Sequence, residues 1–232
     1  MCFSASASFG AGVVLSVIGV ASIKKAKSPT QIIFASIPLI FAVQQITEGF
    51  LWLSLTHSNF ASLKQVTTYI FLFFAQIVWP IWVPYAILKL ESKERRRTSE
   101  KILVGIGGIV SIYLAYCLMT FPVEAKVLGY HISYDQNYPA VFSRYCGFLY
   151  IVATIVPPFF SRIRHMWLLG TTILISYIIT TIFYADYIVS VWCFFASIIS
   201  IAVYVIIHDL NNKNKIIFKS DSNDNSNPAF VG

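Results

Sequence analysis

The stretch IIFASIPLIFAVQQITEGFLWLSL, residues Ile32–Leu55, decides the fold class because it is apolar over a length that crosses a bilayer. A helix rises about 1.5 Å per residue, so roughly 20 apolar residues span a hydrocarbon core of about 30 Å. A strand of a membrane barrel would alternate apolar and polar residues instead. One ionisable residue, Glu48, interrupts the run. The stretch therefore predicts a membrane-spanning helix that carries a buried acid.

Six further apolar runs predict an all-α, polytopic membrane protein with seven transmembrane helices. The chain is 57% hydrophobic and 12% charged, which excludes a water-soluble enzyme. Residues 1–208 form the predicted transmembrane domain, and the polar residues 209–232 predict a disordered cytoplasmic tail. The seven predicted spans are Phe3–Ile23, Ile32–Leu55, Val66–Leu90, Ile102–Phe121, Tyr145–Phe160 (extended upstream to Ala140), Met166–Tyr184 and Tyr187–Ile207.

The basic residues predict how the chain lies in the membrane. Of the 17 Lys and Arg residues, 14 fall in alternate loops and in the tail, which leaves Lys64, Lys126 and Arg144 for the other side. The positive-inside rule then places the N-terminus outside and the C-terminus in the cytoplasm of a cell inner membrane. The basic run Glu91–Arg97 lies directly beside two spans, so it indicates a loop that faces anionic lipids rather than a nucleic-acid partner.

Small residues and prolines predict how the helices pack. Without water, helices associate where small side chains let two backbones approach. Such residues recur in the first span at Ser4, Ser8, Gly12 and Ser16, and in the fourth at Gly105 and Gly108. In the third span Pro80 and Pro84 remove amide donors, so we expect a broken helix whose freed carbonyls face protein or a cavity.

Glu48 is the leading candidate for a functional residue, because an ionisable group inside a span costs at least roughly 2.5–3.5 kcal/mol on insertion scales. Gln44 is four residues away and shares its helical face, which Trp52 continues one turn further. We expect an outward-facing cavity around Glu48, over which the outer loop from Pro122 to Ser143 folds as a lid. Its predicted ligand-binding residues are Glu48, Gln44, Gln45, Gln76, Trp79, Trp52 and Trp192.

A metal ion is the one cofactor that the residues suggest. Zinc sites combine His, Cys and carboxylate ligands, and the best set available is Cys2, Glu48, His131 and Asp135. The four cysteines all fall in the predicted outer third, where an oxidising exterior permits the pairs Cys117–Cys146 and Cys2–Cys193, with free thiols as the alternative. The chain has no Gly-rich phosphate loop, no Gly-x-Ser-x-Gly elbow and no Cys-x-x-Cys.

Three functions remain open from the residues alone. The first is a membrane protein that binds a small solute, an ion or a lipid headgroup in the outward-facing cavity, for transport or sensing. The second is a membrane-embedded, metal-dependent enzyme that uses Glu48 and Cys2. The third is a scaffold whose polar residues hold helices together.

Four short motifs carry a resemblance to a known family. They are the opening MCFSASASF (Met1–Phe9), the segment VQQITEG (Val43–Gly49), the tryptophan and proline pairs between Trp79 and Pro84, and VWC (Val191–Cys193). Together they resemble an uncharacterised family of small bacterial integral membrane proteins that share this N-terminal start. The resemblance covers nearly the whole chain. It implies a bacterial origin and a common site at these residues, but no chemistry.

Overall fold

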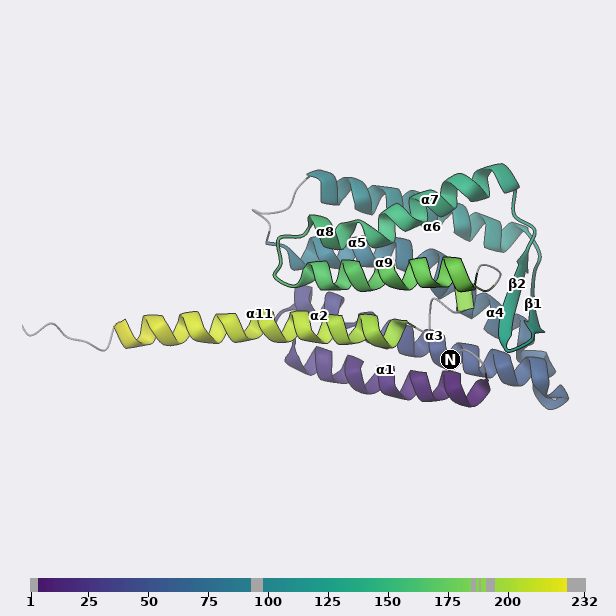
Figure 1. Ribbon diagram of the computed structural model, residues 1–232, viewed down its shortest axis with the longest axis horizontal. Helices are drawn as coiled ribbons and strands as arrows, with labels where there is room; N and C mark the ends of the chain where they lie inside the picture. Colours follow the sequence, from purple (N-terminus) through teal and green to yellow (C-terminus); the bar gives the residue numbers. More distant parts are fainter. Residues whose placement is uncertain (1–3, 93–97, 185–186, 188, 191–194, 225–232) are drawn as a thin grey trace, which may run out of the picture.

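The computed structural model is a bundle of helices that run along one long axis, with a two-stranded hairpin lying across one end (Figure 1). The structure describes residues 4–92, 98–184, 187, 189–190 and 195–224. Its long helices are α1 (Ala5–Lys25), α3 (Ile37–Thr56), α6 (Thr98–Thr120), α7 (Ala140–Ile155), α9 (Met166–Phe183) and α11 (Ala196–Asp224). Shorter segments are α2 (Pro29–Ala35), the 3-10 helix η1 (Ser58–Leu63), α4 (Lys64–Leu72), the π-helix η2 (Phe73–Val78), α5 (Trp79–Leu90) and α8 (Pro157–Phe160).

Five helical stretches are long and apolar enough to cross a membrane, among the residues that the structure describes. They are Ala5–Lys25, Pro29–Thr56, Ser58–Leu90, Thr98–Thr120 and Met166–Phe183. They coincide with the first four and the sixth of the predicted spans. The fifth and seventh predicted spans contain shorter apolar helices, Tyr145–Ile155 and Ala196–Asn212.

The hairpin corrects the expectation of an all-α chain. Strand β1 (Val123–Leu128) pairs antiparallel with β2 (His131–Gln136), and the register joins Leu128 to His131 across a two-residue turn. Gly129 takes a positive φ of 61° in that turn, which a residue without a Cβ adopts freely. Ala125 is buried between two exposed residues, and Ile132 is buried between two half-buried ones. This alternation is too short to stand out in an otherwise apolar chain.

The polar C-terminal segment is also different from the expectation. We predicted disorder from residue 209 onward, but α11 continues as a helix through Asp224 and extends beyond the rest of the bundle (Figure 1). The start of this segment is anchored, because the side chain of Asn211 donates to the carbonyl oxygen of Lys25 at 2.6 Å. Neither Pro nor Gly interrupts the sequence before Pro228, so nothing forces the helix to end earlier.

Close packing of α1 on α3 builds one side of the bundle. A Cβ at Gly12 would lie 2.7 Å from the side chain of Ile46, and one at Gly19 would lie 2.6 Å from Leu39. Ser8 and Gly12 of the predicted small-residue stripe are therefore part of the seam, which then continues through Gly19 rather than Ser16. Small residues set this approach, as expected for helices that pack in lipid.

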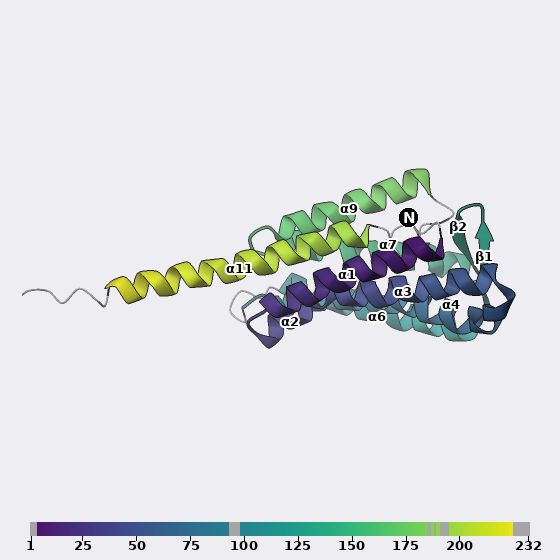
Figure 2. The same cartoon turned by 90° about the horizontal axis from the view of Figure 1, so that it is seen from below.

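The two ends of the bundle differ in charge. The end opposite the hairpin carries Lys24 and Lys25 in the last turn of α1, Lys27 after it, Lys89 in α5, and Arg162 and Arg164 before α9. Figures 1 and 2 show that these segments lie together, away from β1 and β2. Glu91, directly after α5, bonds to the segment between α8 and α9. It accepts hydrogen bonds from the hydroxyl of Ser161 at 2.7 Å and the amide of Arg162 at 2.8 Å.

Candidate functional site

A break in the third apolar run is the starting point of the site. In a π-helix each amide bonds to the carbonyl five residues back, and η2 places Ala75 five residues before Pro80. Pro80 has no amide hydrogen to donate. Instead, the hydroxyl of Tyr150 in α7 donates to the carbonyl oxygen of Ala75 at 2.6 Å, and that of Ser111 in α6 donates to Ile77 at 2.7 Å. Tyr150 thus supplies a donor where Pro80 has none, and Ser111 adds a second bond from a neighbouring helix to the carbonyls of η2.

A cavity of about 310 Å³ lies beside this break. It is enclosed by segments that are far apart in the sequence, namely α3, η2, α5, α6, α7, α9, α11 and the end of β2. Its volume is at the lower end of the range for small-molecule sites. Its wall consists of Ile37, Phe41, Ala75, Gln76, Trp79, Val83, Leu114, Gln136, Tyr138, Cys146, Gly147, Tyr150, Ile151, Thr154, Leu169, Ile173, Tyr177, Val189 and Ile199.

The wall is apolar and aromatic, and it carries no Asp, Glu, Lys, Arg or His among the described residues. Several of its polar groups bond to the protein itself. The indole nitrogen of Trp79 donates to Gln44 at 2.7 Å, and the hydroxyl of Thr154 donates to the carbonyl of Tyr150 at 2.8 Å. Phe41 stacks on Trp79 with ring centroids 3.9 Å apart. Such a wall favours an uncharged and mostly apolar guest, because a charge would lose its hydration without gaining a partner.

The end of the hairpin lies at one end of the cavity, where it bonds to Gln76 of η2. The side chain of Gln76 donates to Gln136 at 3.0 Å and accepts from the hydroxyl of Tyr138 at 3.1 Å. Burial raises the pKa of Tyr138, so this hydroxyl keeps its proton and remains a donor. Ala125 and Ile132 of the hairpin pack on Leu51 and Trp52 of α3. The hairpin, which is part of the loop from Pro122 to Ser143, therefore lies at one end of this cavity, whereas the sequence analysis expected that loop to cover a cavity around Glu48.

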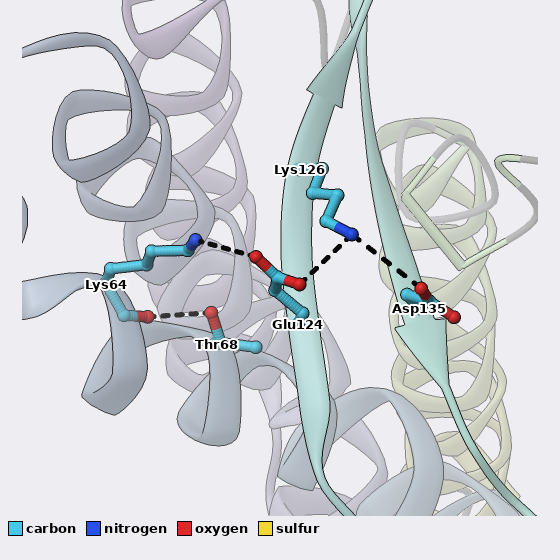
Figure 3. Close-up of polar contacts among 5 residues, drawn as sticks. All are labelled: Lys64, Thr68, Glu124, Lys126 and Asp135. Carbon is cyan, nitrogen blue, oxygen red and sulfur yellow. Dashed lines mark hydrogen bonds and ion pairs between the residues drawn. The ribbon is translucent and has the colours of Figure 1, made fainter.

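A chain of ion pairs holds the hairpin against α4 (Figure 3). Glu124 lies between Lys64 at 3.6 Å and Lys126 at 3.0 Å, and Lys126 also contacts Asp135 on β2 at 3.8 Å. The hydrogen bond and charge of Lys126 lower the pKa of Glu124, and Glu124 in turn raises the pKa of Lys126. These side chains are between 39% and 64% exposed, so the pairs orient the hairpin more than they stabilise the fold.

Glu48 does not line the cavity. Its carboxylate is fully buried, where it accepts hydrogen bonds from Ser190 at 2.6 Å and from Gln45 at 3.1 Å. Of the predicted ligand-binding residues, Gln76 and Trp79 are in the cavity wall, and Gln44 is behind it as the partner of Trp79. Trp52 packs under the hairpin. The cavity is therefore centred on the π-helix rather than on the buried acid, and Trp192 lies outside the described residues.

The predicted metal set is not brought together. His131 begins β2 and Asp135 is its next-to-last residue, so the two are four residues or roughly 14 Å apart at about 3.4 Å per residue. Asp135 contacts Lys126, and His131 stacks on Tyr187 with centroids 4.6 Å apart. Within the described part of the chain, no three His, Cys, Asp or Glu side chains form a group that could hold a metal ion. The fourth member, Cys2, lies outside the described residues.

Cys117 and Cys146 are both free and buried, so the first of the two predicted disulfides is absent here. Cys146 lies in the cavity wall. The second pair, Cys2 and Cys193, lies outside the described residues. The alternative of free thiols holds for the two cysteines that the structure describes.

Comparison with known proteins gives one match. A family model described as a family of unknown function (DUF6629) matches residues 1–216. The chain belongs to this family. The comparison with curated proteins and the comparison with solved structures each gave no match. The expected membership of an uncharacterised family is confirmed, and membership assigns no activity to the cavity.

Sequence reasoning missed several residues of the site because they lie far from the third span in the chain. Tyr150, Tyr138 and Gln136 reach the π-helix across 60 to 75 residues. In an α-helix Pro80 would free the carbonyl of Gln76, but the π-helix moves the missing bond to Ala75, and no local pattern shows that Tyr150 will bond there. Tyr138 and Gln136 also belong to a loop whose hairpin was not predicted.

Proposed function

We propose that the chain is a seven-pass inner-membrane protein that binds an uncharged, largely apolar small molecule in the cavity beside η2, in transport or sensing. The predicted spans and the gathering of basic residues at one end support this topology, with the hairpin outside and the basic end in the cytoplasm. The basic end would then face anionic lipids. The hairpin would form the outer cover of the cavity.

One observation carries the choice of ligand. The described wall holds no formally charged side chain, and its aromatic residues Phe41, Trp79, Tyr138, Tyr150 and Tyr177 come from separate elements. A flat, neutral molecule fits such a wall, whereas an ion or a charged lipid headgroup does not. This narrows the three ligand classes that the sequence left open to the first, a small solute.

The break in the third span supports a transport or sensing role. Transporter sites commonly lie where a helix is discontinuous near the middle of the bilayer, and π-helical turns are frequent at functional sites. Here the break and the cavity share Ala75 and Gln76. A guest in the cavity would touch the segment of the bundle with the least regular hydrogen bonding.

The position of Glu48 gives the enzyme hypothesis no support. A catalytic acid must reach the substrate, and this carboxylate is buried away from the cavity wall with Ser190 and Gln45 as partners. We therefore propose that Glu48 joins α3 to the residues that precede α11. This is the role that the scaffold hypothesis gives to polar residues. The ligand would then bind in the cavity beside η2 and not at Glu48.

The proposal is tested by partition of a probe into nanodiscs. Purified protein in nanodiscs and empty nanodiscs are equilibrated with 2,3-dimethylnaphthalene or with 2-naphthoate, and the retained probe is measured by chromatography. We expect saturable retention of the neutral hydrocarbon, at one molecule per protein, and none of the anion beyond that in empty nanodiscs. Equal retention of both probes, or retention of the anion alone, would contradict the proposal.

Two glycines provide a matched pair of variants. Gly147 lines the cavity, and a Cβ added there meets no atom within 4 Å. Gly105 in α6 is equally open but is not in the cavity wall. We expect Gly147→Leu to reduce retention of the hydrocarbon at least severalfold and Gly105→Leu to leave it unchanged. The same loss in both variants would place the binding elsewhere.

A further inference from the structure

A directed chain of hydrogen bonds runs along the hairpin end of the cavity and ends on an unused donor. The hydroxyl of Tyr138 donates to Gln76 Oε1, and Gln76 Nε2 donates to Gln136 Oε1. Gln136 Nε2 is buried and has no hydrogen-bond partner within the described part of the chain. Because Gln136 also lines the cavity, the chain ends beside the space that a ligand would fill.

Buried amide donors without a partner are uncommon and costly, so each one calls for an explanation. Here the series of hydrogen bonds strengthens the argument, because an amide that accepts at its carbonyl is polarised and becomes a better donor at its nitrogen. The two steps from Tyr138 through Gln76 point the same way, toward Gln136. The end of a glutamine side chain also turns over a broad range about its last torsion. We expect a rotation about that torsion to turn this N–H toward a guest in the cavity.

The partner that this donor lacks is an acceptor. The oxygens of Gln76 and Gln136 each accept one hydrogen bond, whereas Gln136 Nε2 makes none within the described residues, so a guest that accepts supplies what is missing here. A ketone or quinone carbonyl has that property, and its flat ring suits an aromatic wall in which Trp79 is one face. An ammonium or a carboxylate would bring an unpaired charge into an uncharged wall.

We infer that the ligand of this cavity is a flat, uncharged carbonyl compound of the ketone or quinone class, whose oxygen accepts a hydrogen bond from Gln136 Nε2. This inference rests on the proposed function and adds the chemical group by which the ligand is recognised. Gln136 is then the specificity-determining residue, while the aromatic wall supplies most of the contact area.

Two probes that differ in the carbonyl groups test the inference. They are 2,3-dimethyl-1,4-naphthoquinone and 2,3-dimethylnaphthalene, measured by partition between protein-loaded and empty nanodiscs. The quinone has no free position on its quinone ring, so it resists addition of the cavity thiol of Cys146. We expect the wild-type protein to bind the quinone about tenfold more tightly than the hydrocarbon, as one buried hydrogen bond provides.

Variants at adjacent positions separate recognition from folding. Gln136→Met keeps the length of the side chain and removes its N–H, whereas Asn137→Met likewise replaces a side-chain amide by an apolar thioether at the exposed neighbour. We expect the tenfold preference to disappear in Gln136→Met, with hydrocarbon binding retained, and to persist in Asn137→Met. If Gln136→Met does not fold, the comparison of the two probes on the wild-type protein still decides the question.

The outcomes separate the two proposals. If both probes bind the wild-type protein equally well, or if Gln136→Met keeps the preference, the carbonyl inference is wrong while the cavity still binds apolar molecules. If neither probe is retained beyond empty nanodiscs, the proposed function fails and the inference fails with it. Equal loss of both probes in Gln136→Met would make Gln136 a structural residue and would also overturn the inference.

Discussion

The contact between α5 and α6 at Gly107 allows a sharp prediction. A Cβ at Gly107 would lie 1.9 Å from the carbonyl oxygen of Pro80 and 2.8 Å from its carbonyl carbon. Relief to an ordinary contact of 3.4 Å or more would require the two backbones to separate by more than 1 Å, because neither atom belongs to a flexible side chain. Ser111, one turn further along α6, would then lose its 2.7 Å hydrogen bond to Ile77.

The magnitude follows from two opposing effects. Overpacking costs typically 1–3 kcal/mol, and a backbone clash of this depth places Gly107→Ala at about 3 kcal/mol. Alanine in place of glycine returns about 1 kcal/mol of helix propensity. We therefore expect a net loss of about 2 kcal/mol, which lowers Tm by roughly 4–8 °C in a chain of this length.

Gly105 and Gly108 are the matched controls, because they are on the same helix and a Cβ at either position meets no atom within 4 Å. We expect Gly105→Ala and Gly108→Ala to leave Tm unchanged or raise it by about 2–4 °C. The assay is the fraction of monodisperse protein that survives heating in detergent, measured by fluorescence-detected size exclusion. Shifts of the same sign and size in all three variants would refute the close approach of α6 to Pro80.

Three further predictions concern single hydrogen bonds and one titration. Ser190→Ala leaves one oxygen of the buried Glu48 carboxylate without this donor, so we expect it to destabilise the fold by about 2 kcal/mol, seen as a lower Tm in the same heating assay. Tyr150→Phe leaves the carbonyl of Ala75 without its donor, and we expect a loss of about 1–2 kcal/mol by the same measurement, with weaker retention of 2,3-dimethylnaphthalene. Burial lowers the pKa of His131 below its ordinary 6.5, so the folded state binds its proton less readily than the unfolded state does. The stability that the neutral ring contributes is therefore present above pH 6.5 and is lost as the pH falls from 6.5 through the folded pKa. We expect Tm measured between pH 7.5 and 5 to decline, and to decline less steeply in His131→Phe.

Matched variants at exposed positions give each of these results its control. Ser58→Ala and Tyr116→Phe remove the same hydroxyl groups from exposed side chains and should leave Tm within experimental error. Equal effects at exposed and buried positions would mean that the two hydrogen bonds contribute nothing specific. A decline in Tm that is as steep in His131→Phe as in the wild-type protein would assign the pH dependence to other groups.

The fold could be predicted as far as it depends on the length and composition of apolar runs. All seven predicted spans contain helix, and five are long enough to cross a membrane within the described residues. The hairpin escaped prediction because its one clear alternation, around Ala125, covers a few residues only. The helix after Asp209 escaped because its composition is that of a disordered tail, while its anchor, the bond from Asn211 to Lys25, joins opposite ends of the chain.

The site could be predicted in part, and for a physical reason. Pro80 identifies the break in the helix, and Gln76 and Trp79 beside it do line the cavity. Glu48 was the strongest polar signal in the spans, but burial of an acid is costly whether its partners are structural or functional. One of its partners, Ser190, lies 142 residues away in the sequence, so no local pattern could show the surroundings of this acid.

The distribution of hydrogen bonds explains how a broken helix and an apolar cavity can share a wall. A break exposes carbonyl oxygens, and exposed carbonyls would attract water and make the space beside them polar. Tyr150 and Ser111 bond to the carbonyls of Ala75 and Ile77 from neighbouring helices, so the break is satisfied without water. Removal of either hydroxyl should therefore make the cavity wetter as well as the fold less stable. A neutral apolar probe would then lose affinity in Tyr150→Phe even though phenylalanine is the more apolar residue.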